Sequence, residues 1–357
     1  MAWLIGDSFD FYNAGADLLL NADVWASFVN TPFLTNGGRF VASGRSLVLG
    51  TGGSAGATVI TRTFANSTTL FVNMNIVSSQ AHVNGGTTPI IGFAWRDENG
   101  PAIQGGVYLR NGGDFIITSG PTGGTILGTS PVLAPSANVW MHIEVKIVVN
   151  GTTGSVELRH IDINGASTPW VVTGINTRNG TANPFANSIQ IQGTSASSDL
   201  ADDFYVFNDQ GIAPNDWQGD VYSYPLRPNS DISVSWNRNT GTHNFEAVDD
   251  TAEDGDTTMV STNVVNAVDH YGVNALATEP LTTVAVTLTY MARMDDAGPH
   301  QVTAQLISGP TTDSLPALIL TNSYVIHQKT YPQDPNTSAL WAAANVDALI
   351  LGIKLLL

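Results

Sequence analysis

The chain has 357 residues, and its 30 acidic against 13 basic side chains give a formal net charge of −17. Hydrophobic residues make up 43% and charged residues only 12%, a balance that excludes a disordered chain. The lack of cysteine excludes a disulfide scaffold, Cys-ligated zinc and a cysteine nucleophile, and the acidic balance argues against nucleic-acid binding.

Neither a targeting sequence nor a membrane segment is expected. The N-terminal segment Met1–Asp10 lacks a basic region followed by an apolar core. The best apolar run, Ala348–Leu357, contains Lys354 and is far shorter than the ~20 residues that span a bilayer. We therefore expect a chain made in the cytoplasm without a signal peptide.

Glycine usage changes near residue 210 and predicts two domains. Of 35 glycines, 27 lie in residues 1–210, and all seven Asn-Gly pairs also lie there. Asn-Gly is a strong signal for tight β-hairpin turns because both central residues need positive φ. We predict a first domain over 1–210 and a second over 211–357.

The first domain is predicted to be antiparallel β throughout. Apolar residues alternate with polar ones over Leu70–Val77 and Val139–Val149, and the second run turns at Asn150–Gly154 into a partner strand, Ser155–Ile163. Further strands are expected at Ile90–Trp95, Gly106–Leu109, Phe115–Ser119, Ser188–Gln192 and Asp203–Phe207. Many short strands separated by Gly and Asn favour a jelly-roll β-sandwich.

The second domain is predicted to be mostly β with one short helix. The run Val284–Ala292 alternates, and strands follow near Val302–Leu306 and Ser323–Thr330. A helix is expected from about Ser338 to Leu349, before a terminal strand, Ile350–Leu357. That strand is a candidate assembly element through Leu351, Ile353 and Leu355; the alternative is an ordinary core strand.

Adjacent carboxylates begin the last strand of the first domain and suggest a metal site. Asp202 and Asp203, with Asp209 just past the strand, could supply oxygen ligands to Ca²⁺. The alternative is that they cap a turn and solvate a strand edge. The acidic run Asp249–Asp256 departs from an EF-hand at Ala252 and Ser261, so a solvated loop is expected there.

No catalytic motif is evident. The histidines form no close pair, although His142 and His160 lie on the two strands of one predicted hairpin and could face each other. No Gly-x-Ser-x-Gly elbow occurs, and nothing selects a cross-strand acid pair such as Glu144 with Glu157. We therefore expect no enzyme activity.

Aromatic residues of the first domain could form a platform for sugar rings. The candidates are Trp95, Tyr108 and Trp170, with Trp140 as a fourth. The alternative is that most of them fill the core, because a sandwich of this size needs large side chains between its sheets. Trp170, which follows Pro169, is the one expected to be exposed.

The first domain resembles concanavalin A-like lectin domains of the laminin-G type. The resemblance rests on Phe9-Asp10, the Val139–Ile163 hairpin and the Asp202–Val206 strand. The second part is similar to a module of tailed-phage and prophage structural proteins. The shared features are Gly219–Val221, Leu226–Asp231, Trp236, Asp254–Thr258, Arg293–Gly298, Asp334–Thr337, Trp341 and Leu351–Lys354.

These resemblances imply a non-enzymatic virion protein and no catalytic residues. The first hypothesis is a tail- or fibre-associated protein that adsorbs to a host surface glycan, as a homo-oligomer contacting other tail, baseplate or capsid proteins. The alternatives are a capsid decoration protein without a ligand and, third, a polysaccharide-degrading hydrolase. Contact with nucleic acid or a membrane is not expected.

Overall fold

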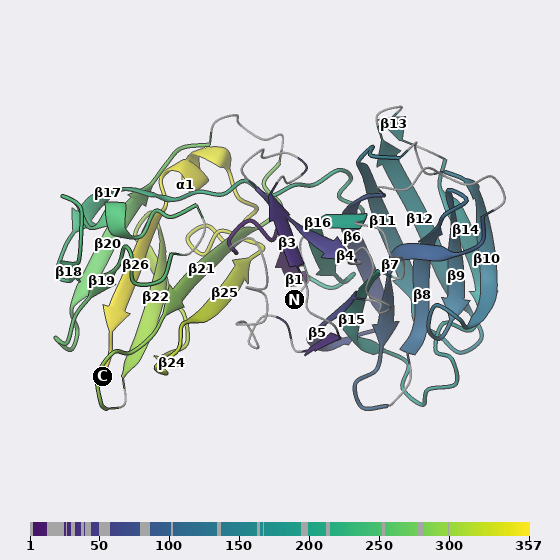
Figure 1. Cartoon of the computed structure of the whole chain (residues 1–357), viewed down its shortest axis with the longest axis horizontal. Coiled ribbons are helices and arrows are strands. Elements are labelled where there is room, and N and C mark those ends of the chain that lie inside the picture. The colour runs from purple at the N-terminus through teal and green to yellow at the C-terminus, as the bar shows by residue number, and fades with distance from the viewer. Residues whose placement is uncertain are drawn as a thin grey trace. The chain divides into compact units, whose positions relative to one another are not determined.

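The computed structural model describes residues 3–12, 25, 27–29, 33–36, 39, 44–49, 58–78, 86–100, 103–133, 137–162, 165–166, 168–193, 199–211, 215–251, 254–276, 282–298 and 300–357. The chain divides into two compact units, Met1–Ser223 and Tyr224–Leu357 (Figure 1). Residues 211–223 belong to the first unit, whereas the sequence predicts a domain boundary at 210.

The first unit is a sandwich of two antiparallel sheets, which Figure 1 shows in purple to teal. Sheet A has the order β13 (Gly165–Ala166), β12 (Gly154–Asp162), β11 (Met141–Val148), β6 (Thr69–Val77), β16 (Asp199–Phe207), β4 (Arg45–Leu49) and β3 (Phe33–Asn36), with β1 (Trp3–Asp7) beside β16 and β14 (Trp170–Ile175) beside β12.

Sheet B has the order β10 (Thr125–Val132), β9 (Asp114–Ser119), β8 (Ile103–Arg110), β7 (Pro89–Arg96), β15 (Ala186–Gly193), β5 (Thr58–Ser67) and β2 (Ser27–Val29). Strands distant in sequence are neighbours in each sheet, β6 and β16 in sheet A and β7 and β15 in sheet B. The predicted all-β, jelly-roll class is confirmed, and the alternating runs form β6, β11 and β12.

Strand periodicity explains why sheet A has one apolar and one polar face. Leu70, Val72, Met74 and Ile76 of β6 are fully buried and face the core with the apolar residues of β11. The intervening residues of both strands lie on the opposite face, because successive side chains of a strand point to opposite sides. That second face carries mostly polar groups.

The second unit is built around a six-stranded antiparallel sheet. Its order is β17 (Pro228–Ser233), β20 (Val268–Val273), β26 (Ile350–Leu355), β22 (Gln301–Ser308) and β23 (Thr311–Ser314), with β24 (Leu318–Ile319) beside β22. Two strand pairs accompany it, β18 (Asn237–Arg238) with β19 (Val260–Ser261) and β21 (Val286–Ala292) with β25 (Val325–Tyr331).

The helix of the second unit is shorter than predicted. Helix α1 spans only Ala343–Asp347, and a 3₁₀ turn, η2, spans Phe245–Ala247. The expected start fails because Ser338 has φ 56°, a left-handed conformation, and because Trp341 forms a β-bridge with Thr283. The buried Trp341 ring, whose Nε1 donates to the Tyr331 carbonyl at 2.8 Å, thus ties the segment to the sheet.

Strand β26 is an internal strand, which corrects the assembly hypothesis. It pairs with β20 on one edge and β22 on the other, with Leu351 opposite both Tyr271 and Leu306. Both edges are therefore occupied within the chain, and Leu355 is buried. Leu351, Ile353 and Leu355 hold the core of the second unit and offer no free edge to another copy.

In the part of the chain that the structure describes, no helix has the length and apolar character needed to cross a membrane.

Candidate functional site

The polar face of sheet A gathers the most unusual side chains of the first unit. On β6 it carries Phe71, Asn73 and Asn75, and on β11 it carries His142 and Glu144. Register places Asn73 opposite Glu144 and Asn75 opposite His142. All five residues are buried, although four of them are polar. Buried polar groups gathered in this way mark a candidate site.

A β-bulge brings two carboxylates to this face from β16. The pairing of β16 with β6 shifts between Asp202 and Tyr205, and Asp203 has φ 46°. Left-handed backbone is tolerated by Asp better than by most residues, and bulges redirect side chains locally. The Asp203 carboxylate accepts from Tyr205 Oη at 2.9 Å and from Asn75 Nδ2 at 3.0 Å.

The last residues of the first unit, Trp217–Ser223, lie across this face and are called the strap here. The Glu144 carboxylate accepts the backbone N–H groups of Gln218 at 2.6 Å and Gly219 at 3.1 Å. The Asp203 carboxylate accepts the N–H of Ser223 at 2.9 Å. Two buried acids thus hold the strap through its backbone.

An ion pair fixes the middle of the strap. Arg39 donates two hydrogen bonds to Asp220, at 2.5 and 2.7 Å, and also contacts Asn75 Oδ1. The backbone N–H of Arg39 donates to Asp202 at 2.8 Å. Nδ1 of His142 lies 2.9 Å from Asn75 Oδ1 and 3.7 Å from Asp220.

An aromatic cluster continues the polar face at the start of the strap. The Trp217 ring meets Phe71 edge-on at 5.5 Å, and Phe71 stacks on Phe207 at 5.1 Å. The Arg159 guanidinium lies 3.8 Å from the Trp217 ring centroid. Such cation–π contacts orient the ring without burying it fully.

Burial shifts the protonation of these groups. It raises the pKa of Glu144 to about 7, against the opposing effect of the two strap N–H groups, and lowers the pKa of His142 to about 4. Burial also raises the pKa of Asp202 and Asp203, and the Asp203 charge raises that of Asp202 further. Shifted titratable groups of this kind cluster at functional sites.

Two groups on this face lack hydrogen-bond partners. The side chain of Asn73 is 1% exposed, and neither its Oδ1 nor its Nδ2 has a hydrogen-bond partner among the residues that the structure describes. Nε2 of His142, also 1% exposed, has none either. An unpaired buried amide costs about 1–3 kcal/mol, so such groups usually meet a water or a ligand.

The predicted Ca²⁺ site does not fit the geometry. Asp202 and Asp203 receive N–H or O–H donors, which point positive hydrogen atoms at the carboxylates where a cation would lie. Asp209 is exposed and accepts from its neighbour Gln210. Among the described residues, no group of three or more His, Cys, Asp or Glu side chains could hold a metal ion.

The predicted sugar platform is also corrected. Trp95 and Tyr108 are fully buried in sheet B, where Trp95 Nε1 donates to the Thr177 carbonyl and Tyr108 Oη to Gln192. Neither can present a ring to a ligand. Trp170 is half-buried at the start of β14, and its ring lies over Gly128 of β10. Trp217 is not recognisable from the sequence, because the residues around it lack any periodic pattern.

The cross-strand pairs considered from sequence do not form. In the β11–β12 register His142 lies opposite Ile161, and His160 lies opposite Ile143, so the two imidazoles point to opposite faces. Glu144 lies opposite Arg159, not Glu157. Directly opposite residues of paired strands share a face, and successive residues of a strand alternate between faces. The register therefore decides that neither proposed pair is directly opposed.

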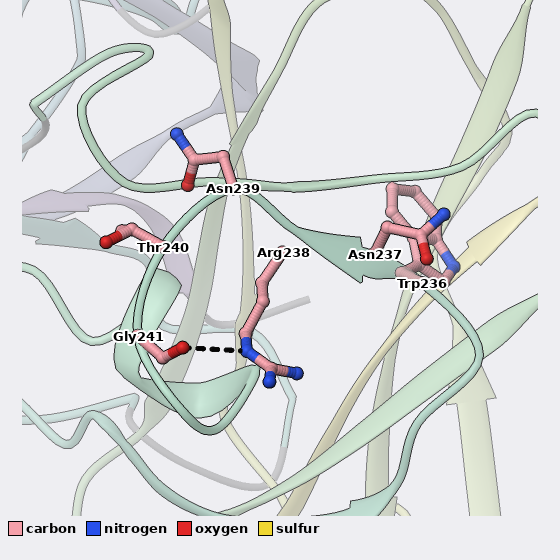
Figure 2. Close-up of a pocket in the computed structure, with 6 residues that line it drawn as sticks. All are labelled: Trp236, Asn237, Arg238, Asn239, Thr240 and Gly241. Atoms are coloured by element: carbon pink, nitrogen blue, oxygen red, sulfur yellow. Dashed lines mark hydrogen bonds between the residues drawn. The ribbon is translucent and has the colours of Figure 1, made fainter.

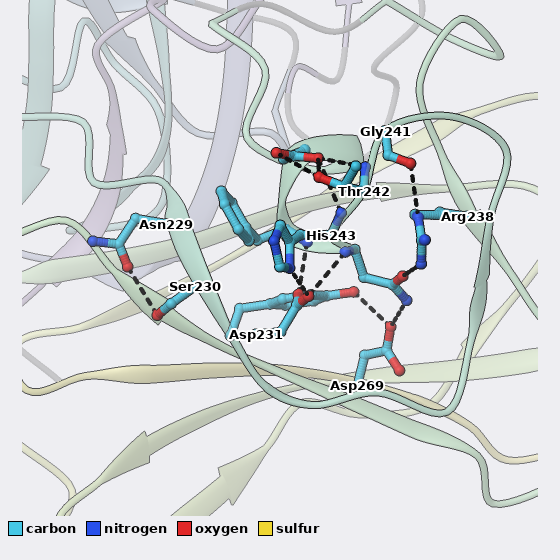
Figure 3. A network of polar contacts seen from close by, with 12 residues as sticks. Asn229, Ser230, Asp231, Arg238, Gly241, Thr242, His243 and Asp269 are labelled. Carbon is cyan, nitrogen blue, oxygen red and sulfur yellow. Dashed lines mark hydrogen bonds and ion pairs between the residues drawn. The ribbon is translucent and has the colours of Figure 1, made fainter.

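A second buried polar network lies in the second unit (Figure 3). The fully buried Asp269 carboxylate accepts from Ser235 N, Trp236 N, Asn244 Nδ2 and Tyr271 Oη at 2.5 to 2.8 Å. Asp231 accepts the N–H groups of Asn244 and Phe245. Each carboxylate oxygen of Asp269 accepts two hydrogen bonds, so this network holds the loop that contains Ser235, Trp236 and Asn244.

The hollow beside this network, of about 390 Å³, is lined by Trp236–Gly241. Figure 2 shows Arg238 reaching toward the Gly241 carbonyl, which it meets at 3.0 Å, while Asn239 and Thr240 point away from it. The Asn239 amide is used by Asp256 O and Met259 N. Most polar groups of this loop are hydrogen-bonded to other groups of the chain, so they do not converge on a ligand.

The acidic run Asp249–Asp256 is also engaged within the chain. Asp250 and Asp254 both accept from the Thr258 hydroxyl, and Asp256 pairs with Arg293 at 2.8 Å. Residues 252–253 lie outside the described part.

No protein-family model matches the chain, and no curated protein sequence matches it. Similar solved structures include peanut lectin with a 9-residue peptide (9% identity, TM-score 0.36, covering 58% of this chain and 98% of that chain). Lectin II from Ulex europaeus (11%, 0.37, 57% and 97%) and the metal-free VIP36 exoplasmic/lumenal domain (12%, 0.37, 59% and 93%) are others. Likeness at this level carries no inference about ligands.

Proposed function

We propose that the protein is a non-enzymatic structural protein of a tailed-phage particle that binds a surface glycan through the polar face of sheet A. The observation that carries the glycan-binding part is the array of acids, amides and a ring on that face. Glu144, Asp203 and Asn73 supply hydrogen-bonding groups, and Phe71, against which the Trp217 ring packs, supplies an aromatic surface.

This combination matches the chemistry of a glycan. Sugar hydroxyls both donate and accept, so carboxylates and amides on one face satisfy them together. The apolar faces of sugar rings pack on aromatic side chains, and Phe71 lies on this face beneath the half-buried Trp217 ring.

The arrangement of the acids favours binding over hydrolysis. Glycoside hydrolysis needs two carboxyl groups that flank a bond and reach a water or the sugar carbon. Glu144 and Asp203 instead accept backbone N–H groups of the chain itself. We therefore assign them to holding and recognition, with no catalytic role.

The phage assignment rests on the resemblance of the second part to tailed-phage structural modules. A cysteine-free chain with low charge and two β-rich units suits a particle appendage. Placement at the tail or fibre, assembly as a homo-oligomer and contact with other virion proteins belong to this proposal, as does location in the virion.

The test is a glycan array probed with the whole chain, followed by binding to host cells. We expect at least one class of bacterial surface glycan to be retained and to compete with cell binding. No retention on an array that includes host capsule and wall glycans would contradict the glycan-binding role.

A further inference from the structure

We propose that the strap, Trp217–Ser223, is a displaceable cover over a hydroxyl-binding position at Asn73 and His142, and that a glycan binds by taking the place of the strap. This inference rests on the proposed function. It adds the position at which the glycan binds and the segment that must move to expose it.

The first argument is the unpartnered amide. Asn73 lies between Glu144 of β11 and Tyr205 of β16, and its donor and its acceptor both lack partners at 1% exposure. A group that satisfies both atoms must accept from Nδ2 and donate to Oδ1. Hydroxyl groups of a sugar, or the water that they would displace, do so, whereas a simple anion or cation satisfies only one of them.

The second argument is the tautomer of His142. An amide oxygen only accepts, so Nδ1 carries the hydrogen that faces Asn75 Oδ1. Nε2 then carries no hydrogen, is buried and has no hydrogen-bond partner in the described part of the chain, while the backbone of Gly219 in the strap also interacts with the ring. Nε2 can accept a hydrogen bond, as Asn73 Oδ1 can. The neighbouring strands β6 and β11 therefore carry two acceptors and one donor with which a hydroxyl-bearing ligand can pair.

The third argument is that the strap presents ligand-like groups to the sheet. It offers three N–H donors, from Gln218, Gly219 and Ser223, to the carboxylates of Glu144 and Asp203. The Ser223 hydroxyl lies 2.9 Å from Tyr205 Oη. A glycan would offer hydroxyl donors to the same acceptors, so exchange leaves the two buried acids hydrogen-bonded.

The fourth argument is the shallow burial of the strap. None of its seven residues is buried, whereas Asn73, Asn75, His142 and Glu144 beneath it are. Removing the strap therefore exposes little apolar surface of its own. The Trp217 ring packs edge-on against Phe71, which makes Trp217 the residue to change.

The experiment compares four forms of the whole chain: wild type, Trp217→Ala, Asn73→Ala and the double variant. Each is measured for oligosaccharide binding by calorimetry, with the array hit as probe, and for hydrogen exchange of residues 218–223. Asn73→Leu replaces Asn73→Ala if the latter unfolds. Trp170→Ala is the matched control, because it removes a half-buried tryptophan from the β14 edge of the same unit.

We expect Trp217→Ala to speed strap exchange and to bind about tenfold tighter than wild type, because less free energy is needed to lift the strap. We expect Asn73→Ala to weaken binding about tenfold in both backgrounds and Trp170→Ala to leave it unchanged.

Binding that is indifferent to Asn73, or faster strap exchange without tighter binding, would overturn this inference and leave the proposed function standing. Loss of binding in Trp170→Ala alone would do the same. The lack of any glycan binding in all forms would contradict the proposed function itself.

Discussion

The two units each bury a polar network, and the networks differ in how completely they are paired. In the second unit, Asp269 receives four donors and closes a loop around itself. In the first unit, Asn75 and Asp203 are paired in the same manner, but Asn73 and Nε2 of His142 are not. A fully paired network fixes a backbone, while open atoms beside it leave capacity for something else.

The largest expected effect is in the closed network. Asp269→Ala leaves four donors without their acceptor; two of them, Asn244 Nδ2 and Tyr271 Oη, are buried, and each buried unsatisfied group costs about 1–3 kcal/mol. We expect the second unit to lose at least about 3 kcal/mol in its free energy of unfolding, measured by urea denaturation. Asp295→Ala, at an exposed position, is the control and should change little. Equal stability of the two variants would show that the Asp269 network does not hold the loop.

The next prediction is that two asparagines of β6, Asn75 and Asn73, differ in their contribution to the stability of the first unit. Asn75→Leu breaks contacts with Asp203, His142 and Arg39 and should destabilise the first unit by about 2–4 kcal/mol. Asn73→Leu removes an amide that pays a burial cost without a partner, so stability should stay equal or rise. Denaturation of both variants tests the contrast. A large loss for Asn73→Leu would mean that its amide is satisfied.

A smaller effect concerns pH. The pKa of Glu144 rises from 4.5 to about 7 on burial, so the folded state holds the proton more tightly than the unfolded state. The contribution of Glu144 is therefore full at low pH and is lost as pH rises through 7. We expect wild type to lose up to about 3 kcal/mol between pH 5 and 8 from this group, and Glu144→Gln to lose less.

Thermal unfolding at several pH values measures this, with Glu157→Gln on the adjacent strand as the control. His142 acts in the opposite sense, since its lowered pKa costs stability only as pH falls below about 6.5. The same slope in Glu144→Gln and wild type would remove Glu144 as the titrating group.

The smallest effect is at Asp209. This carboxylate is exposed and accepts a hydrogen bond from the neighbouring Gln210, so Asp209→Ala should change stability by less than about 0.5 kcal/mol. Calcium titration followed by thermal unfolding should leave wild type and variant equal. A Ca²⁺-dependent rise in the unfolding temperature of wild type alone would restore the predicted metal site.

The strands could be predicted from the sequence because apolar and polar residue types alternate along them. The alternation over Leu70–Val77 and Val139–Val149 sets both the strands and the faces on which Asn73 and Glu144 lie. The jelly-roll class followed from many such runs and their Asn-Gly turns. Local pattern is sufficient where one face of a strand is apolar.

The site could be predicted only in part. Asp202 and Asp203 stand out as neighbouring acids, but their partners come from distant segments, Arg39 and Ser223. The strap has no periodicity, and its contacts with Glu144 span more than 70 residues of sequence. The sequence does not show that Trp95 and Tyr108 are buried, because the burial of an aromatic side chain depends on which face of the sheet it occupies.

The most direct test of the central claim is hydrogen exchange of the whole chain with and without a saturating glycan. The account predicts that the amides of Gln218, Gly219 and Ser223 are protected in the free protein and lose protection when glycan binds, while β6 stays protected. Glycan binding that leaves these three amides equally protected would contradict the account, because the polar face of sheet A would then remain covered.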